Sequence, residues 1–208
     1  MYGEEEYGAG QAQNNAIRQS NRKKTIIIVV ISIIILAVII GVIALSAAKK
    51  QREEIAAYEL DMSIVRLSML SSAAEAEDAG NLIKSVWYNA IYEESDFETD
   101  KYTQPYGYFV SDFNIALSNL FADPEFQSQI SSIESDQSYI TDTMKRLVNP
   151  PEGYEEAYEA IKELYDAYLS LSNLVISPSG SLTTFSEDFN EMDSEVLDCY
   201  KATEIYID

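Results

Sequence analysis

Residues 25–48 read TIIIVVISIIILAVIIGVIALSAA, and this stretch sets the organisation of the whole chain. It contains no charged residue over its 24 positions. As a helix rising 1.5 Å per residue it is about 36 Å long, enough to cross the roughly 30 Å hydrocarbon core of a bilayer with some tilt. A helix also satisfies its own backbone hydrogen bonds inside lipid. The stretch therefore predicts a single transmembrane helix, and the lipid bilayer is the first partner we expect.

The apolar run has two alternative interpretations, a permanent anchor or a cleaved signal peptide. A signal peptide has an apolar region of roughly 7–15 residues followed by a small-residue cleavage site. Ala44, Ser46 and Ala48 provide small residues, but the run is longer than that and begins only at residue 25. We therefore favour an uncleaved anchor. No cysteine lies near the end of the run, which excludes a lipidated lipoprotein anchor.

Basic residues flank the apolar run on both sides. Four precede it and three follow it: Arg18, Arg22, Lys23 and Lys24, then Lys49, Lys50 and Arg52. This small excess predicts, by the positive-inside rule, a cytoplasmic N-terminus and an extracytoplasmic C-terminal domain. Residues 1–24 are rich in Gly, Gln and Asn and contain few apolar residues, which predicts a disordered cytoplasmic tail.

Residues 49–208 have the length of one ordinary domain and are strongly acidic. They contain 10 Lys and Arg against 32 Asp and Glu, a net charge of −22. Such a surface repels nucleic acid and anionic lipid, so we expect no nucleic-acid partner. It provides either a docking face for a basic partner or cations, or a soluble surface that prevents clumping. We favour the second interpretation.

Apolar residues after position 49 recur at steps of three or four, the period of one helix face. A long first helix is expected to carry the stripe Ile55, Tyr58, Met62, Val65, Met69, Ala73, Ala76, Gly80, Ile83, Trp87 and Ala90. The segment SDFETDKYTQPYG, residues 95–107, combines acids with Pro105 and Gly107 and is expected to end this helix. A short second helix is expected to carry Phe109, Phe113, Ala116, Leu117 and Leu120, and to stop at Asp123-Pro124.

Three further helices follow with the same period. Their stripes are Phe126, Ile130, Ile133, Gln137, Ile140, Met144 and Leu147; then Tyr154, Ala157, Tyr158, Ile161, Leu164, Tyr165, Tyr168, Leu171 and Val175; then Phe185, Phe189, Met192, Val196, Cys199 and Tyr206. Prolines at 150–151 and 178 separate them, because proline cannot continue the helical ladder. Thr184 and Glu187 have the spacing of a capping box. The predicted fold is all-α: a single N-terminal transmembrane helix followed by residues 49–208 as an antiparallel bundle of four to five helices, the first one long.

Several side chains invite a functional interpretation beside a structural one. Four of the 15 tyrosines, Tyr154, Tyr158, Tyr165 and Tyr168, lie on the fourth predicted helix. They form either a stacking surface for sugars or aromatic ligands, or a core edge that leaves its hydroxyls wet, and we favour the core edge. Trp87 lies on a core stripe, and Cys199 has the spacing of a small buried residue.

Most catalytic chemistry is excluded by what the chain lacks. It has no histidine and a single cysteine, which removes His-based nucleophile sites, His-based zinc sites and cysteine-rich metal sites. Asp96, Glu98 and Asp100 begin a calcium-loop spacing, but Lys101 stands where the loop needs glycine and Gly107 where it needs glutamate. We therefore predict an ordinary acidic loop. The sequence predicts no catalytic, cofactor-binding or metal-binding residue, no cofactor and no enzymatic activity.

The C-terminal third, roughly residues 145–202, resembles a loose group of Gram-positive surface proteins and lipoproteins. Their pattern of Pro-Pro, a Tyr-bearing helix, Pro-x-Gly-Ser-Leu and a Phe-bearing helix matches Pro150, Pro151, Tyr158, Tyr165, Tyr168, Pro178, Gly180, Ser181, Leu182, Phe185 and Phe189. The resemblance implies an extracytoplasmic location and carries no activity with it. This chain departs from the lipoproteins by having a transmembrane anchor in place of a lipidated cysteine.

These observations predict a membrane-anchored, non-catalytic interaction or scaffold module of the bacterial cell envelope, with a protein partner. The alternative is a ligand-sensing bundle that acts through a separate membrane partner, because a tail of 24 residues is too short for a signalling domain. A parallel homodimer through Ile55, Tyr58 and Met62 is expected to be weak at most. Like charges beside that stripe oppose it: Glu53, Glu54, Glu59 and Asp61.

Overall fold

The computed structural model describes residues 50–207. The predicted tail, 1–24, and the predicted transmembrane helix, 25–48, lie outside the described residues. Within 50–207 every element is helical and no strand occurs, which confirms the all-α prediction for this part of the chain. No helix between residues 50 and 207 combines the length and the apolar character that crossing a membrane requires.

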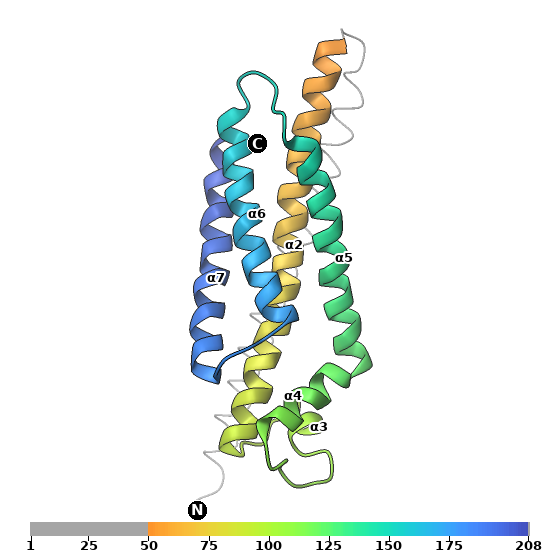
Figure 1. The fold of residues 1–208 in the computed structure, drawn as a ribbon, viewed down its shortest axis with the longest axis vertical. Coiled ribbons are helices and arrows are strands. Elements are labelled where there is room, and N and C mark those ends of the chain that lie inside the picture. The colour runs from red at the N-terminus through yellow and green to blue at the C-terminus, as the bar shows by residue number, and fades with distance from the viewer. Residues whose placement is uncertain (1–49, 208) are drawn as a thin grey trace, which may run out of the picture. The chain divides into compact units, whose positions relative to one another are not determined.

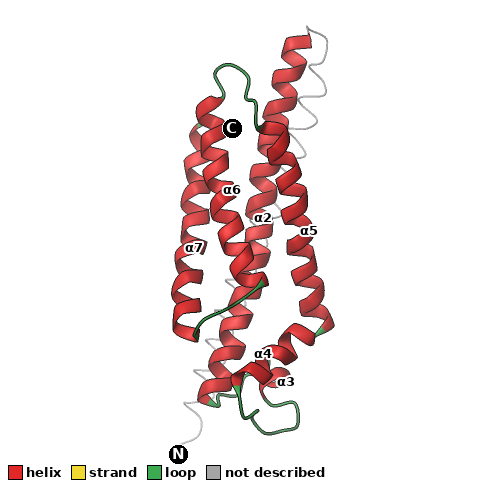
Figure 2. Ribbon diagram, viewed as in Figure 1, coloured by secondary structure: helices red, strands yellow, loops and turns green. Residues whose placement is uncertain are grey.

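The helices follow one another with short connections (Figure 1). Figure 2 shows the same view with helices and loops distinguished. The elements are α2 (Lys50–Tyr92), α3 (Asp100–Thr103), α4 (Phe113–Ala122), α5 (Pro124–Leu147), α6 (Glu155–Ile176), α7 (Leu182–Ala202) and the 3-10 turn η1 (Thr203–Ile205). The chain divides into two units, Met1–Ala56 and Ala57–Asp208, and the second contains most of α2 and all of the later helices.

Within the second unit α2, α5, α6 and α7 run alongside one another, each in the direction opposite to the one before (Figure 1). Their apolar faces form one core. Polar contacts also join α2 to its neighbours. For example, the Tyr58 hydroxyl donates to the Leu147 carbonyl at 3.1 Å, and the hydroxyls of Ser72 and Tyr168 lie 3.0 Å apart. The helices α3 and α4 lie at the end of this unit opposite to Ala57, where α2 ends.

The predicted stripe of α2 forms its buried face. Every stripe residue from Tyr58 to Ala90 is buried, and Ile55 is half-buried. At Gly80 the backbone of α2 lies directly against α7, since a Cβ there would overlap the ring of Phe189 on α7. Because the Phe189 side chain is itself 2 % exposed, the ring has no free space to move into. A residue without a side chain is therefore required where α2 meets α7.

Two helix starts show what the sequence pattern predicts well and badly. The predicted stop at Asp123-Pro124 is confirmed, and Asp123 also caps α5, accepting from the backbone N–H of Glu125 at 3.0 Å and of Phe126 at 3.2 Å. The capping box predicted at Thr184 is wrong. Ser181 is the cap of α7, and its hydroxyl oxygen accepts from the Thr184 N–H at 3.1 Å. The extended backbone of Ser181 (φ −108°, ψ 162°) places that oxygen over the first turn.

Three further details of the sequence-based assignment need correction. The short helix α3 lies inside the segment that was expected to be only a helix terminator. Phe109 precedes α4 in a loop, because that helix begins at Phe113 after the cap Asp112. Tyr206 follows η1 and is 40 % exposed, because α7 stops at Ala202 and the chain then tightens into a 3-10 turn.

Candidate functional site

Exposed apolar side chains gather at the end of the second unit opposite to Ala57. Of the twelve large apolar side chains exposed in the described part of the chain, seven fall between residues 88 and 115. We call these seven the far-end surface: Tyr88, Ile91, Tyr92, Phe97, Tyr106, Tyr108 and Ile115. They belong to the last turns of α2, the loops around α3 and the start of α4 (Figure 1). Concentrated apolar exposure of this kind marks interaction sites in soluble domains.

Local hydrogen bonds hold the loop that carries Phe97. A carboxylate oxygen of Asp96 accepts from the Glu98 N–H at 2.8 Å, and one of Asp100 accepts from the Asp96 N–H at 2.9 Å. The Asn89 amide donates to the Thr99 hydroxyl at 2.8 Å, and both side chains are buried, which ties the loop to α2. Phe97 is nevertheless 97 % exposed. Its ring is thus presented to solvent by a structured loop.

The same bonds show how the acidic side chains of residues 96–100 are used. Asp96 and Asp100 use their carboxylates on backbone N–H groups of their own turn. Among the residues that the structure describes, no group of three or more His, Cys, Asp or Glu side chains is placed to hold a metal ion.

The far-end tyrosines form two ring pairs. Tyr88 and Tyr92, one turn apart on α2, have ring centroids 4.5 Å apart and planes inclined by 39°. Tyr106 and Tyr108, in the loop before α4, have centroids 6.2 Å apart. Within residues 50–207 none of these four hydroxyls makes a hydrogen bond. All four are therefore free to bind an external group.

A groove of about 450 Å³ runs beside the first ring pair, between the end of α2 and the start of α7. We call it the tyrosine groove, and its principal lining residues are Lys84, Tyr88, Tyr92, Asp96, Thr183 and Ser186. Its wall on α2 carries the two rings, and its wall on α7 carries two hydroxyls. The groove therefore combines aromatic surface with small polar groups, the mixture found in ligand sites.

The tyrosines of α6 have a different role. Tyr168 is fully buried beside Ser72, and burial raises the pKa of its hydroxyl. The Tyr165 hydroxyl lies 2.9 Å from that of Thr141, and the Tyr154 hydroxyl donates to the Glu59 carboxylate. Tyr158 packs half-buried against the core. All four rings pack within or against the core, as predicted. The prediction that their hydroxyls stay wet is wrong for Tyr168, whose hydroxyl is buried beside Ser72, and Tyr154 directly precedes α6 instead of lying on it.

Trp87 is also a core residue, as predicted. It is 3 % exposed and packs between Phe113 and Phe185, with ring centroids 5.5 Å and 5.8 Å away. Within residues 50–207 its indole N–H is buried without a hydrogen-bond partner. Cys199 is half-buried, and burial together with nearby carboxylates, among them Glu195, raises the pKa of its thiol. It stays protonated at neutral pH and is not an activated nucleophile.

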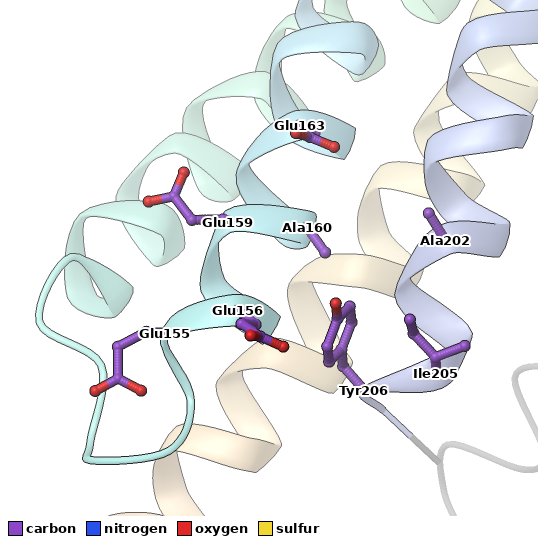
Figure 3. A pocket seen from close by; sticks show the side chains of 8 residues that line it. All are labelled: Glu155, Glu156, Glu159, Ala160, Glu163, Ala202, Ile205 and Tyr206. Atoms are coloured by element: carbon purple, nitrogen blue, oxygen red, sulfur yellow. The ribbon is translucent and has the colours of Figure 1, made fainter.

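A second groove, also of about 450 Å³, lies at the other end of the unit, between the start of α6 and η1. Four glutamates along α6, Glu155, Glu156, Glu159 and Glu163, line it together with Ala202, Ile205 and Tyr206. In Figure 3 Glu156 lies on the side of α6 nearest Tyr206, whereas Glu155 and Glu159 project to the other side of the helix. We call this second groove the acidic groove. Among the described residues, no basic side chain lines it. Its charge attracts cations and repels anions, in keeping with the acidic surface expected for the whole domain.

The far-end surface was not among the predictions from the sequence, although the spacing of apolar residues at the end of α2 indicates part of it. Tyr88, Ile91 and Tyr92 flank the core residues Trp87 and Ala90, and therefore lie off the buried stripe of α2. Apolar residues at positions that face solvent are the pattern that would have identified them. The aromatic residues of the loops, Phe97, Tyr106 and Tyr108, lie close in sequence to acidic residues, Pro105 and Gly107. That composition predicts only the end of a helix and not an exposed aromatic surface.

Comparison with known proteins gives no further guide to function: no protein-family model, no curated protein and no solved structure matches this chain.

Proposed function

We propose that this protein is a membrane-anchored, non-catalytic interaction or scaffold module of the bacterial cell envelope, with residues 49–208 outside the membrane. The far-end surface is the observation that carries the proposal. An exposed group of aromatic side chains on a rigid helical unit is suited to bind a protein partner, since aromatic residues contribute most of the binding energy at interfaces.

The position of this surface along the chain supports the proposal. Only eight residues separate the end of the apolar run, Ala48, from Ala57. From Ala57 to Tyr92, α2 extends over 36 residues, about 54 Å along its axis. The far-end surface thus lies at the end of the second unit opposite to Ala57, the residue at which this unit begins. The resemblance to Gram-positive surface proteins supports the proposed location outside the membrane.

The proposed homodimer is a minor part of this function. Tyr58 and Met62, two of the three residues expected to mediate it, are 8 % and 2 % exposed within the single chain. Ile55 is half-buried, so little apolar surface is left for a second copy. Confinement to a membrane raises the effective concentration of neighbouring chains, and only weak association is expected from it.

A photo-crosslinking experiment tests the far-end surface. A photoreactive amino acid replaces Phe97 in the full-length chain expressed in its native membrane. The matched control is the same group at Tyr139, a 49 % exposed aromatic residue on α5 outside the surface. We expect a discrete crosslinked protein at Phe97 and none at Tyr139. Equal products at both positions, or no product at Phe97, would contradict the proposal.

Protease protection tests the location. Protease added to intact, wall-stripped cells is expected to degrade residues 49–208 and to spare the N-terminal tail, because the domain is proposed to lie outside. Survival of the domain until the membrane is permeabilised would place it in the cytoplasm and overturn the topology.

A ligand-sensing bundle that acts through a separate membrane partner is the second candidate function. The two grooves favour it, because each lies where two helices of the bundle meet. A ligand between two helices changes their relative position only if it binds one arrangement better than the other. This candidate therefore requires a ligand-dependent change in crosslinking at the membrane, which the scaffold does not.

A further inference from the structure

The tyrosine groove has one wall suited to stacking. Tyr88 and Tyr92 are 42 % and 60 % exposed, and their rings lie 4.5 Å apart at an inclination of 39°. The face of an aromatic ring is electron-rich, so it attracts groups whose hydrogens carry partial positive charge. The C–H face of a sugar ring has this property. Because the two rings lie against each other, each leaves its outer, exposed surface for such a ligand to stack on.

The remaining polar groups of the groove are of two kinds, those already bonded within the protein and those left free. Lys84 donates to Asn190 at 3.1 Å, and the Asn89 amide is used on Thr99. By contrast, the hydroxyls of Thr183 and Ser186 make no hydrogen bond within the part of the chain that the structure describes.

With the two tyrosines the groove thus offers four free hydroxyls on two facing helices. Each hydroxyl can donate one hydrogen bond and accept others. The groove therefore matches a ligand that carries several hydroxyl groups.

The charge of the groove narrows the ligand class. Asp96 lines it, and the chain as a whole carries a net charge of −21, so anionic ligands are disfavoured. The single cation of the lining, Lys84, is engaged with Asn190 and also lies 4.7 Å from the centre of the Phe189 ring. A purely apolar ligand would cover the free hydroxyls without bonding them, which costs free energy. A neutral ligand with apolar faces and many hydroxyls avoids both costs, because it carries no negative charge and it can bond the free hydroxyls of the groove.

We propose that the tyrosine groove is a binding site for neutral carbohydrate, with a sugar ring stacked on Tyr88 and Tyr92 and its hydroxyls bonded by Thr183 and Ser186. The volume of about 450 Å³ lies within the range of small-molecule sites. This site goes beyond the protein partner proposed above, and it stands without Phe97, Tyr106 or Tyr108. Tyr88 and Tyr92 belong to both surfaces, whereas Thr183 and Ser186 belong to the groove alone, so Thr183→Ala with Ser186→Ala tests the groove without changing the far-end surface.

The test uses the full-length chain in phosphatidylcholine nanodiscs, because sugar-based detergents would compete for the groove. The probes are maltotetraose, cellotetraose and chitotetraose, and saturation-transfer NMR with titration measures binding. We expect saturable binding of at least one probe. Replacing both rings, Tyr88→Ala with Tyr92→Ala, is expected to weaken it at least about tenfold. Thr183→Ala with Ser186→Ala is expected to weaken it about threefold to tenfold.

The matched control is Tyr106→Ala with Tyr108→Ala, which removes a second exposed ring pair outside the groove. It is expected to leave carbohydrate binding unchanged. Circular dichroism checks that each variant keeps its helices, which is expected because these side chains are exposed, apart from the half-buried Ser186. The proposal is overturned if none of the three probes binds saturably, or if the control pair weakens binding as much as the groove pair does.

Discussion

The tyrosines of α6 and those of the far-end surface are the same residue type in opposite circumstances. Tyr168 is buried with its hydroxyl beside Ser72, and Tyr165 pairs with Thr141. Tyr92 and Tyr106 are 60 % and 79 % exposed, and their hydroxyls make no hydrogen bond within the described residues. The first group stabilises the bundle, whereas the second contributes little to folding and is available for binding.

The contrast shows that the abundance of tyrosine has two separate causes in this protein. A buried tyrosine contributes apolar area and needs a partner for its hydroxyl. An exposed ring pair is not required by folding, because surface substitutions away from special features usually change stability by less than about 0.5 kcal/mol. Function is therefore to be sought where the rings remain exposed.

Removing a whole ring should separate the two groups most clearly. Tyr168→Ala is expected to lower the free energy of unfolding by about 3–5 kcal/mol, because it opens a cavity in the core. Tyr92→Ala is expected to stay within about 0.5 kcal/mol. Urea denaturation of the full-length chain in nanodiscs, followed by circular dichroism, measures both. Equal costs at the two positions would break the comparison.

Gly80 tests how tightly the middle of the bundle is packed. Gly80→Ala is expected to lower the free energy of unfolding by about 1–2 kcal/mol, because overpacking against Phe189 outweighs the gain of up to about 1 kcal/mol in helix propensity. Ser71→Ala, at an exposed position of the same helix, is the control and should be nearly neutral. Adding Phe189→Leu should make Gly80→Ala less costly in a double-mutant cycle, and simple additivity of the two costs would argue against the clash.

Alkaline pH should produce a smaller and more gradual effect. Burial raises the pKa of Tyr58 to about 12, and the hydrogen bond to Glu59 raises the pKa of Tyr154 to about 12. In the unfolded chain both titrate near the ordinary value of about 10. The folded state therefore holds more protons between these values, so the stability contributed below pH 10 is lost as pH rises through 12.

Urea midpoints measured between pH 9 and 12 check this dependence. Tyr58→Phe with Tyr154→Phe should flatten the loss, whereas Tyr106→Phe with Tyr108→Phe, at the far-end surface, should leave it unchanged. An identical pH profile for the wild type and the first double variant would show that the two bonded hydroxyls do not set the alkaline limit.

The period of the sequence predicts the helices and their buried faces because both follow from local spacing. The stripe from Tyr58 to Ala90 is buried along its whole length, and α4 ends directly before Asp123-Pro124, where the pattern places its end. Errors arise at ends and loops. Ser181 caps α7 in place of Thr184, because the backbone conformation before a helix decides which oxygen reaches the free N–H groups.

The excess of acidic residues, the apolar run at residues 25–48 and the lack of histidine can also be read directly from the sequence, because none of them depends on the fold. The tyrosine groove is different. Tyr88 and Tyr92 meet Thr183 and Ser186 across about 90 residues of chain, because α7 returns along α2. The same return brings Phe189 against Gly80. Helix period fixes which residues share a face, but only packing between distant segments decides which faces meet and which side chains are left exposed.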